Sequence, residues 1–179
     1  MGRSFDETFA SELEPLHAYL ARRLGRSAAD DLAAETFAVA YRRWDDVDPE
    51  RPVRPWLYGI ASNLVRHHWR KERRMLRAYA RTGVDPVLTD DAVSPARLEA
   101  RLERAALAEA LAELRDEERE VLLLHAWAEL SDAEIAESLS LPLGTVKSRL
   151  SRAREHMRNR LGFNGQVEVD SPKTVEEQP

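Results

Sequence analysis

The sequence predicts an all-α protein in which two small helical domains are joined by a flexible linker. The 179-residue chain contains only seven glycines and scattered short apolar runs, which favours helices over strands and turns. A proline- and aspartate-rich stretch separates two halves with helical patterns. We place the first domain at residues 1–82, the linker at 83–103, the second domain at 104–162 and a disordered acidic tail at 163–179.

In the first domain, a helix is expected at residues 5–24, ending before a glycine. A second helix is expected from Ser27, whose hydroxyl can cap it, with Asp30 three residues on. The prolines of residues 45–55 cannot continue that helix. The proline that opens residues 55–82 suits a first helical turn, so a third helix is predicted there.

The second domain has the pattern of a helix-turn-helix. Ser131 and Glu134 form a capping box at the start of a short helix, and residues 140–144 form the turn. In the next helix, apolar residues recur at spacings of three and four, which marks the buried face. They are Val146, Leu150, Ala153, Met157 and Leu161.

Charge is distributed unevenly in a chain whose net charge is −5 and whose pI is about 5.6. Residues 66–81 contain seven Lys and Arg residues and one acidic residue, and residues 144–160 contain six Lys and Arg residues and one acidic residue. Between them, residues 109–137 contain ten acids and two arginines. Two basic stretches separated by an acidic one predict two surfaces that face a polyanion.

The exposed face of the last helix can donate hydrogen bonds to phosphates and base edges, and its small serines would let the helix enter a major groove. Trp56, Asn63 and the basic run supply a stacking surface, a polar group and cations for an unpaired strand. Each feature also has an interpretation without DNA. The basic face of the last helix could simply be solvated, Trp56 could be a core aromatic residue, and Asn63 could be an ordinary amide on the helix surface. The DNA-binding candidates are Trp56, Asn63, Arg66, Arg70, Arg73, Arg74, Lys147, Ser148, Ser151 and Arg152.

Enzyme classes are poorly supported. The chain has no cysteine, no glycine-rich phosphate loop, and no HExxH or GxSxG motif. We therefore expect no catalysis, no metal and no cofactor. For Asp30, Asp31 and Glu35, a partner-facing acidic face is favoured over a metal site. No stretch approaches the roughly 18 apolar residues of a membrane span, so we expect no membrane insertion. The absence of cysteine favours a reducing environment, so we expect an intracellular, cytoplasmic location.

Several segments together resemble extracytoplasmic-function (ECF) sigma factors, the small promoter-specificity subunits of bacterial RNA polymerase. The segment GTVKSRLSRARE, preceded by LSDAEIAESLSLP and LRDEEREVLLLHAW, resembles their region four. The segment ADDLAAETFAVAYRRW is similar to the region-two helix that binds core polymerase, and RPWLYGIASNLVRHHWRKERR to the segment that melts promoters and recognises the minus-ten element. These matches span residues 5–161 in the family's order.

The resemblance implies partners and roles. Core RNA polymerase would be bound through its β′ clamp coiled coil and β flap, and promoter DNA as duplex and as melted strand. An anti-sigma factor is a possible further partner, and polymerase-bound protein would be associated with the nucleoid. The positions matching the clamp-binding surface are Asp31, Glu35, Phe37 and Tyr41.

The DNA roles also carry over by position. Trp56 and Asn63 would open the duplex and hold the extruded minus-ten base. Residues 46–53 match the specificity loop that surrounds this base. The recognition-helix candidates of the second domain would read the minus-thirty-five element. Two positions depart from the family pattern: Ala34 stands where glutamine is usual, and Gly59 where arginine is frequent.

The linker length fits two promoter elements about two helical turns, or roughly 70 Å, apart. Residues 83–103, fully extended, span at most about 70 Å, so we expect an open connection rather than a compact helix. The rival function is a self-sufficient helix-turn-helix regulator with an N-terminal sensor or dimerisation domain.

Overall fold

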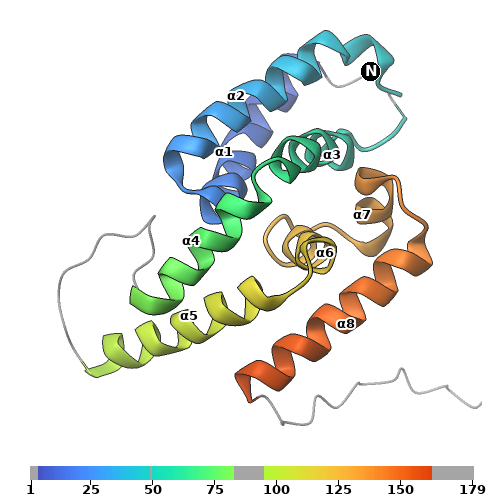
Figure 1. The fold of residues 1–179 in the computed structure, drawn as a ribbon. Coiled ribbons are helices and arrows are strands. Elements are labelled where there is room, and N and C mark those ends of the chain that lie inside the picture. Colours follow the sequence, from blue (N-terminus) through green and yellow to red (C-terminus); the bar gives the residue numbers. More distant parts are fainter. Residues whose placement is uncertain (1–3, 49, 83–94, 163–179) are drawn as a thin grey trace, which may run out of the picture.

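The computed structural model describes residues 4–48, 50–82 and 95–162, and in these ranges the chain is helical with no strand (Figure 1), which confirms the all-α prediction. The helices are α1 (Phe5–Leu24), α2 (Arg26–Arg42), the short 3-10 helix η1 (Trp44–Asp46), α3 (Val53–Arg66), α4 (Trp69–Thr82), α5 (Pro95–Glu113), α6 (Asp116–Ala126), α7 (Asp132–Leu139) and α8 (Leu143–Leu161).

The boundary between α1 and α2 is formed by a single glycine. Gly25 has a φ of 84°, a conformation that favours glycine, and it serves as the C-cap of α1 and the N-cap of α2. The predicted end of the first helix is confirmed. The predicted cap at Ser27 is wrong, because α2 already begins at Arg26 and has no side-chain cap.

The predicted single helix over residues 55–82 is wrong, since α3 ends at Arg66 and α4 begins at Trp69. The turn between them is closed by a hydrogen bond from the His68 N–H to the Val65 carbonyl at 2.6 Å. Helix α4 then leaves in a new direction (Figure 1), and this brings Glu72 and Leu76 into the interior.

Helix α5 begins at Pro95, within the range assigned to the linker, so residues 95–103 are helical rather than open. Most inward positions of α5 carry alanine or a larger apolar residue, so α5 packs along α4 and α8. This packing explains why α5 forms. The rest of the predicted linker, residues 83–94, and the predicted tail lie outside the described residues.

The helix-turn-helix forms as the sequence predicts. Ser131 accepts a hydrogen bond from the Glu134 N–H at 3.3 Å, and the Glu134 carboxylate accepts one from the Ser131 N–H at 2.8 Å. Ser140, in the left-handed region, turns the chain, and Pro142 is the N-cap of α8. Val146, Leu150 and Ala153 are buried, as the stripe predicts.

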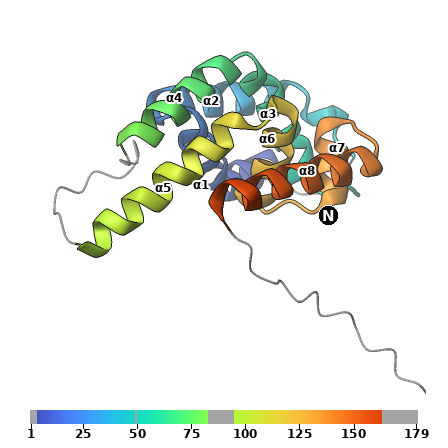
Figure 2. The ribbon, with the colours of Figure 1, turned by 60° about the horizontal axis from the view of Figure 1, so that its bottom comes forward.

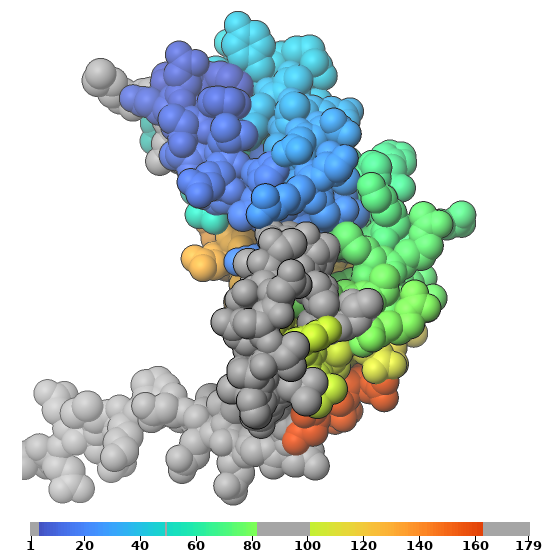
Figure 3. Space-filling view, turned by 90° about the vertical axis from the view of Figure 1, so that its left-hand side faces the viewer, coloured from blue at the N-terminus to red at the C-terminus, as the bar shows by residue number. Residues whose placement is uncertain are grey.

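The N-terminal half (α1–α4) and the C-terminal half (α5–α8) pack against each other. Helix α4 lies along α5, and α3 lies against α7 (Figures 1 and 2). In the space-filling view, the green atoms of α4 adjoin the yellow atoms of the C-terminal half (Figure 3). Buried apolar residues of both halves form one continuous core. The two halves therefore share one packed interior in this structure.

Within the described ranges, every helix is too short or too polar to cross a membrane. The same residues contain no group of three or more histidine and acidic side chains close enough to hold a metal ion.

Candidate nucleic-acid and polymerase interface

The outer face of α8 presents the predicted recognition residues together. Lys147, Ser148, Ser151 and Arg152 are all exposed, because Val146 and Leu150 on the opposite side anchor the helix in the core. The Ser148 hydroxyl donates to the Thr145 carbonyl at 3.0 Å, which leaves its oxygen able to accept from a ligand. This face can therefore lie against a DNA groove without rearrangement of the helix.

The outer face of α8 is modified by an ion pair at Arg152 and by a neighbouring polar hollow. The Arg152 Nε donates to Glu118 of α6 at 2.9 Å, although the Arg152 side chain stays 57% exposed. Beside it, Lys147, Arg154 and Arg158 help to line a polar hollow of about 270 Å³. Asp132 lines the same hollow, but the three cations outnumber it, so an anionic group such as phosphate is favoured there.

Trp56 and Asn63 lie two turns apart on α3 and therefore share one face. The Trp56 ring is half-buried and meets the Trp44 ring edge-on, with centroids 6.3 Å apart. Asn63 is exposed and its amide is open to solvent. The tryptophan thus belongs partly to the core and partly to the surface, while Asn63 is exposed.

The basic residues of α3 and α4 do not all face outward. Arg66, Arg70 and Arg74 are exposed, and the Arg66 guanidinium lies 5.9 Å from the centre of the Trp69 ring. Arg73 is half-buried and donates to Asp116 of the C-terminal half. Three of the four candidates are therefore available to a nucleic-acid backbone in this arrangement.

The predicted polymerase-binding residues of α2 also divide into exposed and buried side chains. Asp31, Glu35 and Tyr41 are exposed, Tyr41 at 68%. Phe37 is only 4% exposed and packs edge-on against Phe9, with centroids 4.8 Å apart. Phe37 therefore supports this surface from beneath.

Sequence reasoning missed two apolar residues of α1. Phe9 is 40% exposed and Leu13 is 38% exposed, so α1 presents apolar surface to solvent near α2. The available signal was the spacing of four residues from Phe5 to Phe9 to Leu13, which puts all three on one helical face.

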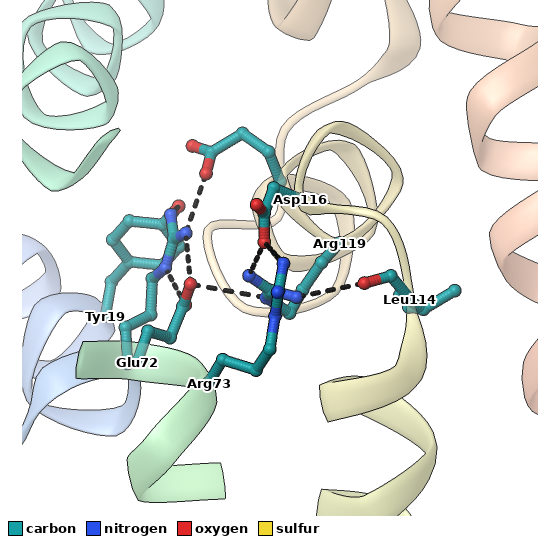
Figure 4. A network of polar contacts seen from close by, with 8 residues as sticks. Tyr19, Glu72, Arg73, Leu114, Asp116 and Arg119 are labelled. Atoms are coloured by element: carbon teal, nitrogen blue, oxygen red, sulfur yellow. Dashed lines mark hydrogen bonds and ion pairs between the residues drawn. The ribbon is translucent and has the colours of Figure 1, made fainter. Parts of the chain in front are cut away.

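Sequence reasoning also missed a buried charge cluster, which we define as Arg23, Glu72, Arg119 and Glu120. Arg23 donates to Glu72 at 2.6 Å and to Glu120 at 2.7 Å, and Arg119 donates to Glu72 at 3.3 Å. Figure 4 shows Glu72 from the N-terminal half directed at Arg119. Asp116 and the Leu114 carbonyl accept further bonds from Arg119.

Within the cluster, Arg23 and Glu120 hold each other in the charged state. Burial lowers the pKa of Arg23, but Glu120 and Glu72 outweigh it and raise that pKa well above the ordinary value. Burial raises the pKa of Glu120, but Arg23 outweighs it and leaves that pKa below 4.5. Ser62 and Trp69 lie close enough to contribute, although neither makes a hydrogen bond of normal geometry. Desolvation raises the pKa of Tyr19, which accepts from Arg23 at 2.6 Å.

The chain matches two protein families along its length. Residues 8–75 match Sigma-70 region 2, and residues 104–157 match Sigma-70, region 4. These ranges contain the exposed faces of α2, α3 and α8 described above.

Curated relatives agree. The chain is 36% identical over 145 residues to the ECF RNA polymerase sigma factor SigW of Bacillus subtilis, covering 74% of this chain and 75% of that protein. It is 35% identical to the RNA polymerase sigma factor CnrH of Cupriavidus metallidurans, covering 70% and 69%. It is 36% identical to the ECF RNA polymerase sigma factor SigL of Mycobacterium tuberculosis, covering 75% and 76%.

Two solved structures are similar in fold. One is CnrH in complex with the cytosolic domain of CnrY, with a TM-score of 0.61 and 28% identity, covering 90% of this chain and 89% of that chain. The other is the sigma factor RpoE in complex with the anti-sigma factor NepR from Bartonella quintana, with a TM-score of 0.64 and 25% identity, covering 90% and 98%.

Proposed function

The chain belongs to the extracytoplasmic-function sigma factors of bacterial RNA polymerase, and we propose that it directs core polymerase to specific promoters through the exposed faces of α3 and α8. As a sigma factor it acts with polymerase in the cytoplasm. The rival function, a self-sufficient regulator, is not favoured, because both halves of the chain match sigma regions.

The observation that carries this proposal is the exposed polar face of α8 on a helix-turn-helix. Lys147 and Arg152 can each donate to guanine or to phosphate, and Ser148 and Ser151 permit close approach to the major groove. We assign this face to the minus-thirty-five element. The polar hollow beside it would hold a backbone phosphate.

The minus-ten element would be held by the N-terminal half. An unpaired base needs a ring to stack on and a hydrogen-bonding group for its edge. Trp56 offers the exposed part of its indole, and Asn63 offers a free amide on the same face of α3. The exposed guanidinium groups of Arg66, Arg70 and Arg74 would follow the strand backbone.

Core polymerase would dock on α2. We assign the β′ clamp coiled coil to the surface formed by Asp31, Glu35 and Tyr41, with Phe37 supporting it, and the β flap to the C-terminal half. The exposed rings of Tyr41 and Phe9 supply the apolar part of such an interface, and the carboxylates supply its charge complementarity.

We also propose an anti-sigma factor as partner, since one similar structure is a sigma factor bound to an anti-sigma factor. The test is to purify this chain at its natural level from its own cells. A co-purifying protein must, once purified separately, abolish transcription by the reconstituted enzyme.

The function itself is tested by reconstitution. The purified chain is mixed with bacterial core polymerase and promoters mapped by overexpression. We expect a stable complex and run-off transcripts that the core enzyme alone does not make. Tight, specific operator binding by the isolated chain, with no effect on core polymerase, would support the rival regulator instead.

A further inference from the structure

A cavity of about 210 Å³ lies between α4, α5 and the C-terminal ends of α1 and α6. Its floor belongs to the core, because Leu76, Ala108 and Leu111 line it and are at most 6% exposed. Its rim reaches solvent, since Leu107 also lines it and is 41% exposed. None of the described residues that line the cavity is assigned to the promoter or to polymerase, so the proposed function does not account for it.

The cavity follows from the side-chain sizes along α5. Four of its lining residues are spaced by three or four positions, so they lie on one face of that helix. They are Arg104, Leu107, Ala108 and Leu111. This face packs along α4 (Figure 1), and the methyl group of Ala108 fills little of the space between the longer side chains around it. A hollow therefore remains where the other three side chains surround the alanine.

The lining favours an apolar group over water. Four aliphatic side chains, a methionine and a tryptophan outnumber the two arginines and the tyrosine. A water molecule held in a cavity needs about two to four polar partners, which the aliphatic floor does not offer. An apolar cavity of about 150 Å³ is enough to bind benzene. This larger cavity therefore has room for an apolar group of about six to eight carbon atoms.

The charged residues that line the cavity favour an anion. Arg22 comes from the last turn of α1 and Arg104 from α5, and no acidic residue is among the described residues of the lining. Arg22 is exposed, and its side chain makes no ion pair or hydrogen bond with another residue in the described part of the chain. A guanidinium group can bind a carboxylate through two parallel hydrogen bonds.

We propose that this cavity binds a small monocarboxylate whose apolar body has about six to eight carbon atoms, with the body on the aliphatic floor and the carboxylate on Arg22. The body would cover Leu107 and remove apolar surface from water, which drives binding. The guanidinium of Arg22 would select the charged head. The site goes beyond the proposed function, and its test needs neither polymerase nor promoter.

Octanoate is the probe, because it joins a carboxylate to an apolar chain of suitable length. Octylamine has the same chain with the opposite charge, and acetate has the carboxylate without the chain. With the full-length protein, we expect saturable one-to-one binding of octanoate in isothermal titration calorimetry and a Tm that rises with its concentration. Octylamine and acetate should do neither. Absence of octanoate binding, or equally tight binding of octylamine, would overturn the proposal.

Arg22→Gln tests the contact with the carboxylate. Loss of a charge-assisted hydrogen bond should weaken octanoate binding on the order of 10-fold. Arg42→Gln is the matched control, because Arg42 is also an exposed arginine in the last turn of its helix but does not line the cavity. This control should bind octanoate like the wild type. Equal affinity in the wild type and in Arg22→Gln would refute the assigned carboxylate contact and with it the proposal.

Leu107→Trp tests the place of the apolar body. The larger ring should occupy the cavity and abolish octanoate binding, with circular dichroism confirming that the helices are kept. Leu102→Trp is the matched control on the same helix, since Leu102 is 65% exposed and does not line the cavity. It should leave the affinity unchanged. Wild-type affinity in Leu107→Trp would place the ligand elsewhere and overturn the proposal.

Fluorine NMR of the fluorotryptophan-labelled wild-type protein locates the ligand without any substitution in the cavity. Trp127 lines the cavity, whereas Trp56 lies on α3 and does not. Spectra of Trp127→Phe and Trp56→Phe assign the two resonances. We expect octanoate to shift the Trp127 resonance and to leave the Trp56 resonance in place. A Trp127 resonance that does not move at saturating octanoate would contradict the site.

Discussion

Phe37 and Tyr41 lie one turn apart on α2 but have opposite surroundings. Phe37 is buried against Phe9, so Phe37→Ala should lower the free energy of unfolding by about 3–5 kcal/mol. Tyr41 is largely exposed and meets Phe5 edge-on, so Tyr41→Ala should lower it by at most about 1.5 kcal/mol while weakening core binding. Denaturant titration and core-binding measurements separate the two effects.

A Tyr41→Ala protein that binds core polymerase like the wild type would contradict the role assigned to this residue. The pattern of the sequence could not separate Phe37 from Tyr41, because a spacing of four residues puts both on one face of α2. Phe37 is buried by residues at the start of α1, and the sequence pattern does not show how α1 packs against α2.

Arg152 connects the proposed recognition face to the rest of the C-terminal half. If it contacts a base, Arg152→Ala should weaken promoter recognition by about 1–3 kcal/mol and relax preference at one position. Glu118→Gln frees the same guanidinium from its 2.9 Å bond, and we expect it to preserve or strengthen recognition. Transcription from a promoter library measures both, and an unchanged sequence preference in the alanine variant would exclude a base contact.

Among the elements, two boundaries with local signals were predicted correctly, whereas the local capping signal at Ser27 was misleading. The end of α1 at Gly25 and the start of α7 at Ser131 each rest on one or two residues adjacent in the chain. The break between α3 and α4 has no such signal, because residues 60–82 contain neither glycine nor proline. It is imposed by packing of Glu72 and Leu76 against the other half, and a single sequence does not show that packing.

Helix α3 is the element proposed to open the duplex. Its half-buried Trp56 should matter most before the strands separate, so Trp56→Ala should reduce transcription strongly from duplex promoters and less from templates with a pre-melted bubble. Equal losses on both templates would mean that Trp56 acts only through its packing on Trp44. Thermal unfolding of the variant provides the stability control.

For the whole molecule, the sequence indicated two basic surfaces and an acidic stretch between them. It did not indicate that Arg119 and Glu120 from that acidic stretch are buried against Arg23 and Glu72. A charged residue in a helix is usually solvent-exposed, and only the approach of a partner helix far away in the chain reverses that expectation. The relative placement of the halves was therefore not predictable from composition or periodicity.

The charge cluster should make the stability of the folded protein dependent on pH. Arg23 holds the pKa of Glu120 below 4.5, so the carboxylate stabilises the folded protein fully above that value. The stabilisation is lost as the pH falls through the lowered pKa. Asp116, whose pKa is held below 3.8 against burial by Arg119 and Arg73, acts in the same direction. The other charged groups of the cluster are Arg23, Glu72 and Arg119, and Tyr19 accepts a hydrogen bond from Arg23.

We therefore expect the contribution of Glu120 to the free energy of unfolding to be constant from neutral pH to about pH 5 and to fall progressively below about pH 4.5, as measured by denaturant titration at each pH. Arg23 adds nothing in this range, because its raised pKa keeps it charged throughout. Glu120→Gln should flatten much of the dependence, since the glutamine does not titrate. If wild type and variant lose stability along the same curve, Glu120 does not control the pH dependence, and a different group must do so.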